Sequence, residues 1–398
     1  MGDLFPEEDA KVEKLIDDIL RSWKNGRNVL LYGPPATGKT RLISSLYRAL
    51  KEKSESSKGI LLDTSSEDLP FKRPDRELPI PTPIRVEWTT FHQSYGYEDF
   101  IIGLRPEVTR AGTELVPWAG ILLDAAIELT DENSGHQSVV IFIDEINRGN
   151  AARIFGEFMT FLDFDYREGG TLPLPLPLRH LAYSDSASQE IRRLDGEKVR
   201  IPREMYFPKN VYIVATMNSV DRAAVPIDSA LARRFDRIEM SPDPQVLLEM
   251  WGLTKTDVPN SNFDDADKFD AHITAYLLLD RLNLAISQDL GPEFELGHGL
   301  FVSMPRPQAP GASEDESWRQ LAEIWDEVIL PQLEDRYAGR PEHLAKLLRV
   351  DDSPAGKEYA WRFRKSYGGT VTSRALENAR ISEHPIETIK NSLRWLVL

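Results

Sequence analysis

The feature that most constrains this chain is a loop with two glycines between an apolar run and a helical segment. The apolar run is Asn28-Val29-Leu30-Leu31-Tyr32, and a helix is predicted from Arg41 to Leu50. The loop between them consists of Gly33, Pro34, Pro35, Ala36, Thr37, Gly38, Lys39 and Thr40. The glycines, the lysine and the threonine fill every fixed position of the phosphate-loop pattern, in the strand–loop–helix context that it requires. We therefore predict that this loop binds a nucleoside triphosphate.

Each fixed residue of the loop has a chemical reason to be there. Backbone N–H groups of the loop can point inward at phosphate, and the helix start adds about half a positive charge. Lys39 can reach the β- and γ-phosphates, and the Thr40 hydroxyl can bind Mg²⁺. Gly33 and Gly38 permit backbone angles and a close approach that a side chain would block.

A second apolar run ends in two carboxylates. Val139-Val140-Ile141-Phe142-Ile143 is typical of a strand buried on both faces, and Asp144 and Glu145 follow it. In open α/β sheets ligands bind beyond the carboxyl ends of the strands. We expect Asp144 to bind Mg²⁺, directly or through water, and Glu145 to polarise the water that attacks the γ-phosphate.

Two further groups are candidates for the same reaction. Asn218 follows the apolar strand 210–216, where its amide is suited to orienting a water or contacting the γ-phosphate. Arg233 and Arg234 offer planar, always-charged donors to phosphate oxygens. Either arginine could act on the nucleotide of a neighbouring subunit, so that hydrolysis depends on assembly.

The chain resembles the AAA+ superfamily and, more narrowly, the McrB-like motors of modification-dependent restriction systems. The resemblance covers residues 25–350, and a weaker echo lies at 296–301 (Leu-Gly-His-Gly-Leu-Phe). It rests on four stretches, namely residues 33–40, Phe91 to Phe100 with its continuation to Pro106, Asp144-Glu145-Ile146-Asn147-Arg148, and Met217-Asn218-Ser219-Val220-Asp221-Arg222.

The resemblance implies an α/β fold with a central parallel sheet flanked by helices, plus a small α-helical lid. It implies that Lys39 and Thr40 bind phosphate and Mg²⁺, that Asp144 holds the metal and that Glu145 activates water. Asn218 would be the first sensor, and Arg233 or Arg234 the finger acting in trans. It also implies a homo-oligomer, a hexamer, that hydrolyses ATP or GTP; no base-reading residue decides between the two.

Three departures from the family pattern carry expectations. Ala36 stands where a glycine is usual, which is tolerable if that position has a negative φ. Ala223 follows Asp221-Arg222 at a position where the family commonly has a serine, which puts the hydrogen bonding there in doubt. The nucleotide strand begins by Asn28, which leaves no room before it for a DNA-reading domain, so we expect a separate effector subunit, such as a nuclease, with DNA contacted through the ring or the partner.

The amino-acid composition argues against several classes of protein. The formal net charge of −16 argues against a strongly basic DNA-binding surface, although a basic pore stays possible. The absence of cysteine excludes disulfides and zinc–thiolate sites. The acidic N-terminus lacks a signal core, and no stretch approaches the roughly 18 apolar residues of a membrane span. We therefore expect a cytoplasmic protein without membrane contact.

The chain divides by pattern into three parts. Residues 1–240 are expected to form the nucleotide-binding domain, with an insertion at 167–209 whose Leu-Pro alternation at 172–178 suits a polyproline-like arm, a hairpin edge or a surface loop. Residues 241–350 are expected to form the helical lid, without strands, from helices at 267–290 and 317–337. Residues 351–398 form an extension whose basic and aromatic residues at 361–367 suit single-stranded nucleic acid or, as we favour, a docking helix.

Smaller elements complete the expectation. We predict helices at 10–24 and 118–129, a strand at 84–91 and an extended surface loop at 52–83. His298, in the expected lid, is a candidate second sensor, although a core or surface role is favoured.

Three functions remain open from the sequence. The first is a ring motor that drives a separate nuclease against foreign DNA. The second is a MoxR- or dynein-related chaperone that remodels proteins. The third is a nucleotide-gated scaffold without useful turnover.

Overall fold

The computed structural model describes residues 6–54, 61–62, 76–109, 112–131, 134–167, 171–173, 188–202, 204–220, 229–259, 269–307, 313–349, 362–365, 371–377 and 380–397. Contacts divide the chain into two units. The sheet unit comprises Asp9–Gly33 and Lys39–Met240. The helical unit comprises Met1–Glu8, Pro34–Gly38 and Ser241–Leu398.

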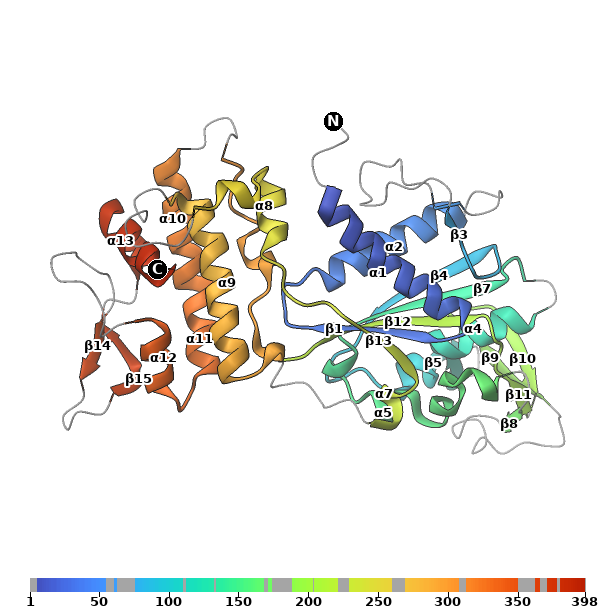
Figure 1. Cartoon of the computed structure of the whole chain (residues 1–398). Coiled ribbons are helices and arrows are strands. Elements are labelled where there is room, and N and C mark those ends of the chain that lie inside the picture. The colour runs from blue at the N-terminus through green and yellow to red at the C-terminus, as the bar shows by residue number, and fades with distance from the viewer. Residues whose placement is uncertain are drawn as a thin grey trace. The chain divides into compact units, whose positions relative to one another are not determined.

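A parallel sheet of five strands organises the sheet unit (Figure 1). Its strands all pair in parallel. In spatial order they are β13 (Phe235–Glu239), β1 (Asn28–Gly33), β12 (Val211–Asn218), β7 (Ser138–Asp144) and β4 (Ile84–Thr90). Because neighbouring parallel strands end at one edge, Gly33, Asp144 and Asn218 reach the same side of the sheet.

Alternate residues of each strand pack into two cores on opposite faces. On one face Leu31, Phe142 and Val214 pack with α1 (Pro6–Lys24) and α2 (Lys39–Ser54). On the other face Leu30 and Ile141 pack with α4 (Ile121–Thr130) and α5 (Ala151–Phe155) (Figure 1). The unbroken apolar runs of the central strands therefore follow from burial on both faces.

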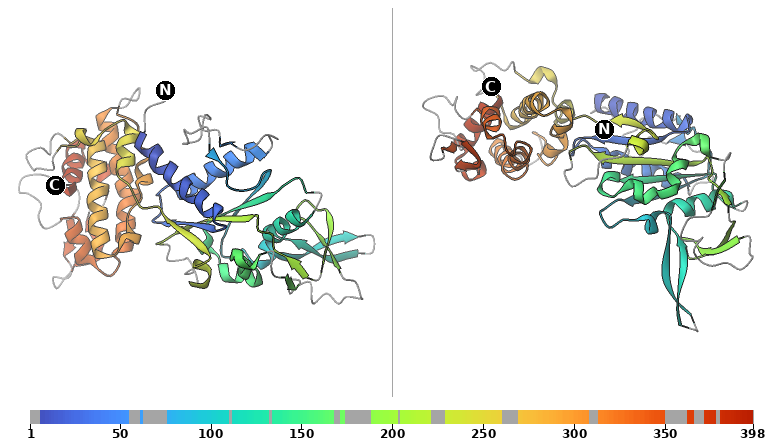
Figure 2. Two further views of the ribbon diagram at one scale, coloured as in Figure 1. Left: turned by 45° about the vertical axis from the view of Figure 1, so that its right-hand side comes forward. Right: turned by 90° about the horizontal axis from the view of Figure 1, so that it is seen from below.

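A second sheet, in the order β10-β9-β6-β5, lies beyond the parallel one. Two antiparallel hairpins form it: β5 (Ile102–Thr109) with β6 (Gly112–Ala119), and β9 (Ser188–Arg192) with β10 (Lys198–Pro202). A parallel bridge, Trp118 opposite Arg192, joins the hairpins. The right-hand view of Figure 2 shows the β5–β6 hairpin projecting away from the parallel sheet. Its exposed face carries Leu104, Val108 and Leu115.

Short elements complete the sheet unit. Strand β8 pairs with β11, and β2 with β3, in antiparallel pairs. These elements are β2 (Leu61–Leu62), β3 (Arg76–Glu77), α3 (Tyr97–Phe100), η1 (Ile146–Arg148), η2 (Gly156–Leu162), η3 (Phe164–Tyr166), β8 (Thr171–Pro173), β11 (Glu204–Tyr206) and α7 (Ser229–Ala232).

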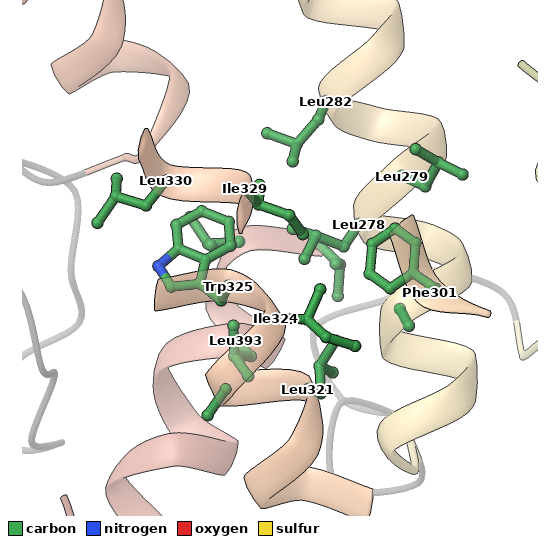
Figure 3. Packing of buried hydrophobic residues seen from close by; sticks show 14 of the residues in the cluster. Leu278, Leu279, Leu282, Phe301, Leu321, Ile324, Trp325, Ile329, Leu330 and Leu393 are labelled. Atoms are coloured by element: carbon green, nitrogen blue, oxygen red, sulfur yellow. The ribbon is translucent and has the colours of Figure 1, made fainter. Parts of the chain in front are cut away.

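The helical unit is built around an apolar core shared by its long helices. Figure 3 shows Leu278, Leu282, Leu321, Trp325 and Leu393 converging from different helices. Its elements are α8 (Gln245–Trp251), η4 (Lys255–Asp257), α9 (Ala271–Asp289), η6 (Pro292–Phe294), η7 (His298–Phe301), α10 (Glu314–Ile324), η8 (Trp325–Ile329), α11 (Leu330–Arg336), α12 (Pro341–Leu347), β14 (Arg362–Lys365), β15 (Val371–Glu377), η10 (Ile381–Glu383) and α13 (Ile386–Val397).

The predicted fold class is confirmed, and the strands expected to carry the site are present. Two boundaries in the sheet unit were wrong. The helix expected from Trp118 begins at Ile121, because residues 112–119 return from the hairpin as β6 and the Gly120 N–H donates to the Ile101 carbonyl at 2.7 Å. The loop expected at 52–83 contains the β2–β3 pair.

Other corrections concern the second half of the chain. The expectation of no strands beyond Met240 was wrong, since β14 and β15 pair there, and residues 362–365 lie in a strand rather than in a docking helix. The helix expected at 317–337 begins at Glu314 and is interrupted by one π-helical turn, 325–329. The helix expected at 267–290 begins at Ala271, where the Asp270 side chain caps it. Of the Leu-Pro stretch 172–178, residues 172–173 belong to β8 and the others lie outside the described residues, as do Asp221, Arg222 and Ala223.

Candidate functional site

The loop 33–40 has a glycine with a positive φ near each end. Gly33 ends β1 with a φ of 153°, and a Cβ at this position would lie 2.4 Å from the Met240 carbonyl oxygen. Gly38 has a φ of 88°, in the region that favours glycine. Both glycines of the motif are therefore required by conformation, and Gly33 also by space.

Lys39 begins α2 and is 5 % exposed. Its Nζ donates a hydrogen bond to the Gly33 carbonyl at 3.0 Å, so its ammonium lies beside the end of β1. Burial lowers the pKa of Lys39 to about 8, and the carboxylates of Asp144 and Glu145 oppose that shift. The negative charge of a bound phosphate would raise this pKa and so favour the charged form of the lysine further.

Ala36 departs from the sequence-based expectation. It has a φ of 61°, so the condition that this position has a negative φ is wrong. A left-handed conformation costs a non-glycine residue roughly 1–2 kcal/mol, which explains why glycine is usual here. Within the loop, the Thr37 hydroxyl donates a hydrogen bond to the Pro34 carbonyl at 3.0 Å.

A hydroxyl and a carboxylate meet where a metal would be needed. The Thr40 hydroxyl is 3.2 Å from Asp144 Oδ1. The Thr216 hydroxyl donates to the same Oδ1 and accepts the Glu145 N–H at 2.9 Å. One threonine at the end of β12 therefore fixes the positions of both acidic residues.

One amide and one guanidinium hold the Glu145 side chain. Asn218 Nδ2 donates to Glu145 Oε1 at 3.1 Å, and the Arg148 guanidinium forms an ion pair with Oε2. Glu145 itself has a φ of 54°. Asn147 Nδ2 donates to the Asn218 carbonyl at 2.9 Å, which ties η1 to the end of β12. The structure thus brings Lys39, Thr40, Asp144, Glu145 and Asn218 together at one sheet edge.

The two candidate finger arginines lie elsewhere and differ from each other. Arg234 is held by contacts within the chain: its Nε is 3.0 Å from Asp163 Oδ2, its Nη1 donates to the Ala230 carbonyl at 2.8 Å, and its side chain is 11 % exposed. The Arg233 side chain is exposed and lines an open pocket with Phe235, Asp236 and Arg237. Only Arg233 therefore presents its guanidinium outward.

Sequence reasoning missed Thr216 and the roles of Asn147 and Arg148. Asn147 and Arg148 belong to the motif that follows the acidic pair, so the sequence singled out these two residues. It did not predict which groups their side chains contact. Thr216 lies near the end of β12, and only the pairing of β12 with β7 places it beside Asp144.

The donor set fits the magnesium that the motif implies. Among the described residues no group of three His, Cys, Asp or Glu could hold a metal alone. The Thr40 hydroxyl and the Asp144 carboxylate are hard oxygen ligands, and Mg²⁺ is commonly bound by one or two carboxylates together with substrate phosphates. Within the same described parts of the chain, none of the helices combines the length and apolarity needed to traverse a bilayer.

The fold and the site define a P-loop nucleotide-binding protein of the AAA+ class. Family models agree: residues 82–235 match the AAA domain of the dynein-related subfamily, and residues 275–345 match the α-helical lid domain of McrB. Together with the relatives below, these matches support an McrB-like AAA+ protein.

Two curated relatives support that assignment. The EcoKMcrB subunit of a type IV methyl-directed restriction enzyme of Escherichia coli (strain K12) is 30% identical over 349 residues, which cover 86% of this chain and 59% of the relative. The component YdiS of the type II restriction enzyme BsuMI of Bacillus subtilis (strain 168) is 29% identical over 110 residues, 26% of this chain and 28% of the relative. The chain therefore spans less than two thirds of either relative.

Proposed function

We propose that this chain is the nucleotide-hydrolysing motor subunit of a restriction system, acting with Mg²⁺ on ATP or GTP and driving a separate effector nuclease. The observation that carries the proposal is the group formed at the sheet edge by Lys39, Thr40, Asp144, Glu145 and Asn218. The printed names of both curated relatives, which are components of restriction enzymes, support the biological setting.

Binding would use the loop and its two flanking side chains. Loop N–H groups and Lys39 would hold the phosphates, while Thr40 and Asp144 would hold Mg²⁺. The metal, when bound, would offset the negative charge of the phosphates. The lowered pKa of Lys39 supports this role, because a buried ammonium has lost water and gains most from an anionic ligand.

Hydrolysis would depend on Glu145. Its carboxylate is the base that would polarise the attacking water and accept its proton, and Asn218 would orient that water near the γ-phosphate. Both oxygens of Glu145 already accept donors, from Asn218 and from Arg148. A change in either contact would therefore alter the basicity and direction of the carboxylate.

Assembly would complete the site. We propose a homo-oligomeric ring, a hexamer, in which Arg233 of one subunit contacts the nucleotide of its neighbour. Its exposed guanidinium supports this choice over Arg234, whose guanidinium is paired with Asp163. DNA would be engaged through the ring or through the partner.

The proposal is tested by nucleotide binding and turnover with and without the candidate nuclease and DNA. Calorimetry should detect ATP or GTP binding by the wild type and none by Lys39→Ala. Glu145→Gln should bind nucleotide but lose turnover, because an amide cannot accept the proton. Equal turnover by Glu145→Gln and the wild type would remove Glu145 from its role, and no binding of either nucleotide by the wild type would overturn the proposal.

A protein-remodelling motor is the second candidate. The match of residues 82–235 to the dynein-related AAA subfamily and the net charge of −16 favour it. Stimulation of turnover by a nuclease partner or by DNA would support the restriction motor. Stimulation by an unfolded protein client alone would support the second candidate.

A further inference from the structure

The Gly297-His298-Gly299 turn contacts the nucleotide loop within the helical unit. The Gly299 N–H donates to the Ala36 carbonyl at 2.8 Å. A Cβ on Gly297 would lie 2.2 Å from the Pro35 carbonyl oxygen and 2.3 Å from the Ala36 carbonyl carbon and oxygen. Gly297 has a φ of −74°, so space rather than conformation requires glycine at this position.

We propose that this turn is a positioning element that sets the direction of the Ala36–Thr37 peptide of the nucleotide loop. The inference rests on the proposed nucleotide binding and adds residues to that site. In a trans peptide the carbonyl and the N–H point in opposite directions. Holding the Ala36 carbonyl on Gly299 therefore turns the Thr37 N–H away from the turn, where a loop N–H can face phosphate.

Ala36 explains why such a hold is needed. Its φ of 61° is unfavourable for alanine, and strained backbone persists only where its surroundings determine it. The hydrogen bond from Gly299 supplies that determination from outside the loop. Gly299 is itself close: a Cβ there would lie 2.8 Å from the Ala36 carbonyl oxygen.

His298 fixes the turn from its other side. Its Nδ1 accepts the Asp243 N–H at 3.2 Å, and the Asp243 side chain in turn accepts the Gln245 N–H at 3.0 Å at the start of α8. The imidazole therefore links the turn to the segment that precedes α8, the first helix after Met240. This contact assigns His298 a positioning role.

The first test compares two glycine-to-alanine variants of the full chain. Gly297→Ala should weaken binding of fluorescent mant-ATP or mant-GTP at least tenfold, because its methyl group displaces the Pro35–Ala36 backbone. Gly135→Ala is the matched control, since nothing lies within 4 Å of its Cβ and its φ is not positive. Adding Ala36→Gly to Gly297→Ala should recover part of the binding, because glycine at 36 lets the peptide turn away from the new methyl group. A misfolded lid would show no such recovery.

Histidine variants supply a second test that does not depend on Gly297→Ala folding. His298→Ala should weaken nucleotide binding severalfold, whereas His298→Asn, which keeps an acceptor near the Nδ1 position, should restore most of it. Thermal unfolding of all variants checks that the helical core is retained. Equal affinity of wild type, Gly297→Ala and His298→Ala would overturn the inference.

A third measurement needs no nucleotide and separates this inference from the proposed function. In hydrogen exchange of the free protein, the Gly299 amide should exchange at least tenfold faster in Gly297→Ala than in the wild type, while amides of α9 stay unchanged. Faster exchange with no nucleotide binding by the wild type would contradict the proposed function but leave the contact supported. Unchanged exchange at Gly299 would overturn the contact itself.

Discussion

Replacing Asp124 with asparagine tests what holds the β9–β10 hairpin to the rest of the sheet unit. The Asp124 side chain is 1 % exposed. It accepts Arg193 Nε at 3.0 Å, Arg193 Nη2 at 3.3 Å, Arg85 Nη1 at 2.7 Å and the Leu194 N–H at 3.2 Å. Arg193 precedes the turn of the hairpin, so this carboxylate joins the hairpin to α4 and β4. Burial would raise the pKa of Asp124, but the donors from Arg193 and Arg85 outweigh burial and lower it.

The cost of the change follows from these contacts. Hydrogen bonds to charged groups contribute roughly 1.5–3 kcal/mol each, and an asparagine keeps only part of the acceptor capacity and none of the charge. Arg193 retains Glu128, and Arg85 retains Glu87, so neither guanidinium is left without a carboxylate. We therefore expect a loss of about 1.5–3 kcal/mol in the free energy of unfolding, below the cost of leaving a buried charge without a partner.

Thermal unfolding of the full chain measures this loss. For a unit of this size, 1 kcal/mol corresponds to roughly 2–4 °C, so the unfolding midpoint of Asp124→Asn should fall by about 3–12 °C. Glu190→Gln is the control on the same hairpin, because its pair with Lys198 at 2.7 Å is about half exposed and should not change the midpoint measurably. A midpoint of Asp124→Asn within 1 °C of the wild type would refute the reasoning, because it would mean that desolvation cancels the ion pairs.

The remaining predictions concern the finger and the response to acid. Arg233→Ala should retain nucleotide binding and lose ~10³-fold or more in turnover of the assembled protein, and mixing it with Lys39→Ala subunits should recover activity if the arginine acts across an interface; no recovery in mixed rings would count against that. Arg234→Ala should instead lower the unfolding midpoint, because its pair with Asp163 is lost. For Glu128, burial would raise the pKa, but donors from His136, Arg193 and Ser134 lower it from 4.5 to about 2. The stability from this group is therefore present above about pH 4.5 and lost as pH falls toward 2, and Glu128→Gln should flatten that part of the pH profile of unfolding.

The parts of the molecule that sequence predicted are those encoded in short, contiguous patterns. The strand 28–33, its loop and the start of α2 follow from an apolar run, two glycines and Lys39-Thr40 within one short stretch. The strand that ends in Asp144 is equally local, because burial on both faces requires an unbroken apolar run. Local patterns of this kind place both the sheet and its carboxyl edge.

The parts that sequence missed depend on distant partners. The alternation at Leu104, Pro106 and Val108 is a strand pattern, but its apolar face is exposed, so burial gave no reason to expect the hairpin. Asp124 and Arg193 are 69 positions apart, and nothing in either neighbourhood predicts their contact. The expectation of an all-helical C-terminal part failed for the same reason, since β14 and β15 are short and specify each other by pairing.

Two non-glycine residues of the site adopt left-handed backbone conformations, and each is determined from outside its own segment. Glu145 donates its N–H to Thr216 on β12, and Ala36 places its carbonyl on Gly299 of the lid turn. Neither conformation is favoured by the residue that adopts it, so each persists only because another element specifies it. The backbone of Glu145, the proposed catalytic base, and the loop 33–40 are thus both held by contacts with distant segments, which a short sequence motif does not contain. A substitution at Thr216 or at Gly299 would therefore change the backbone conformation of Glu145 or of Ala36 without changing any residue of the nucleotide motifs.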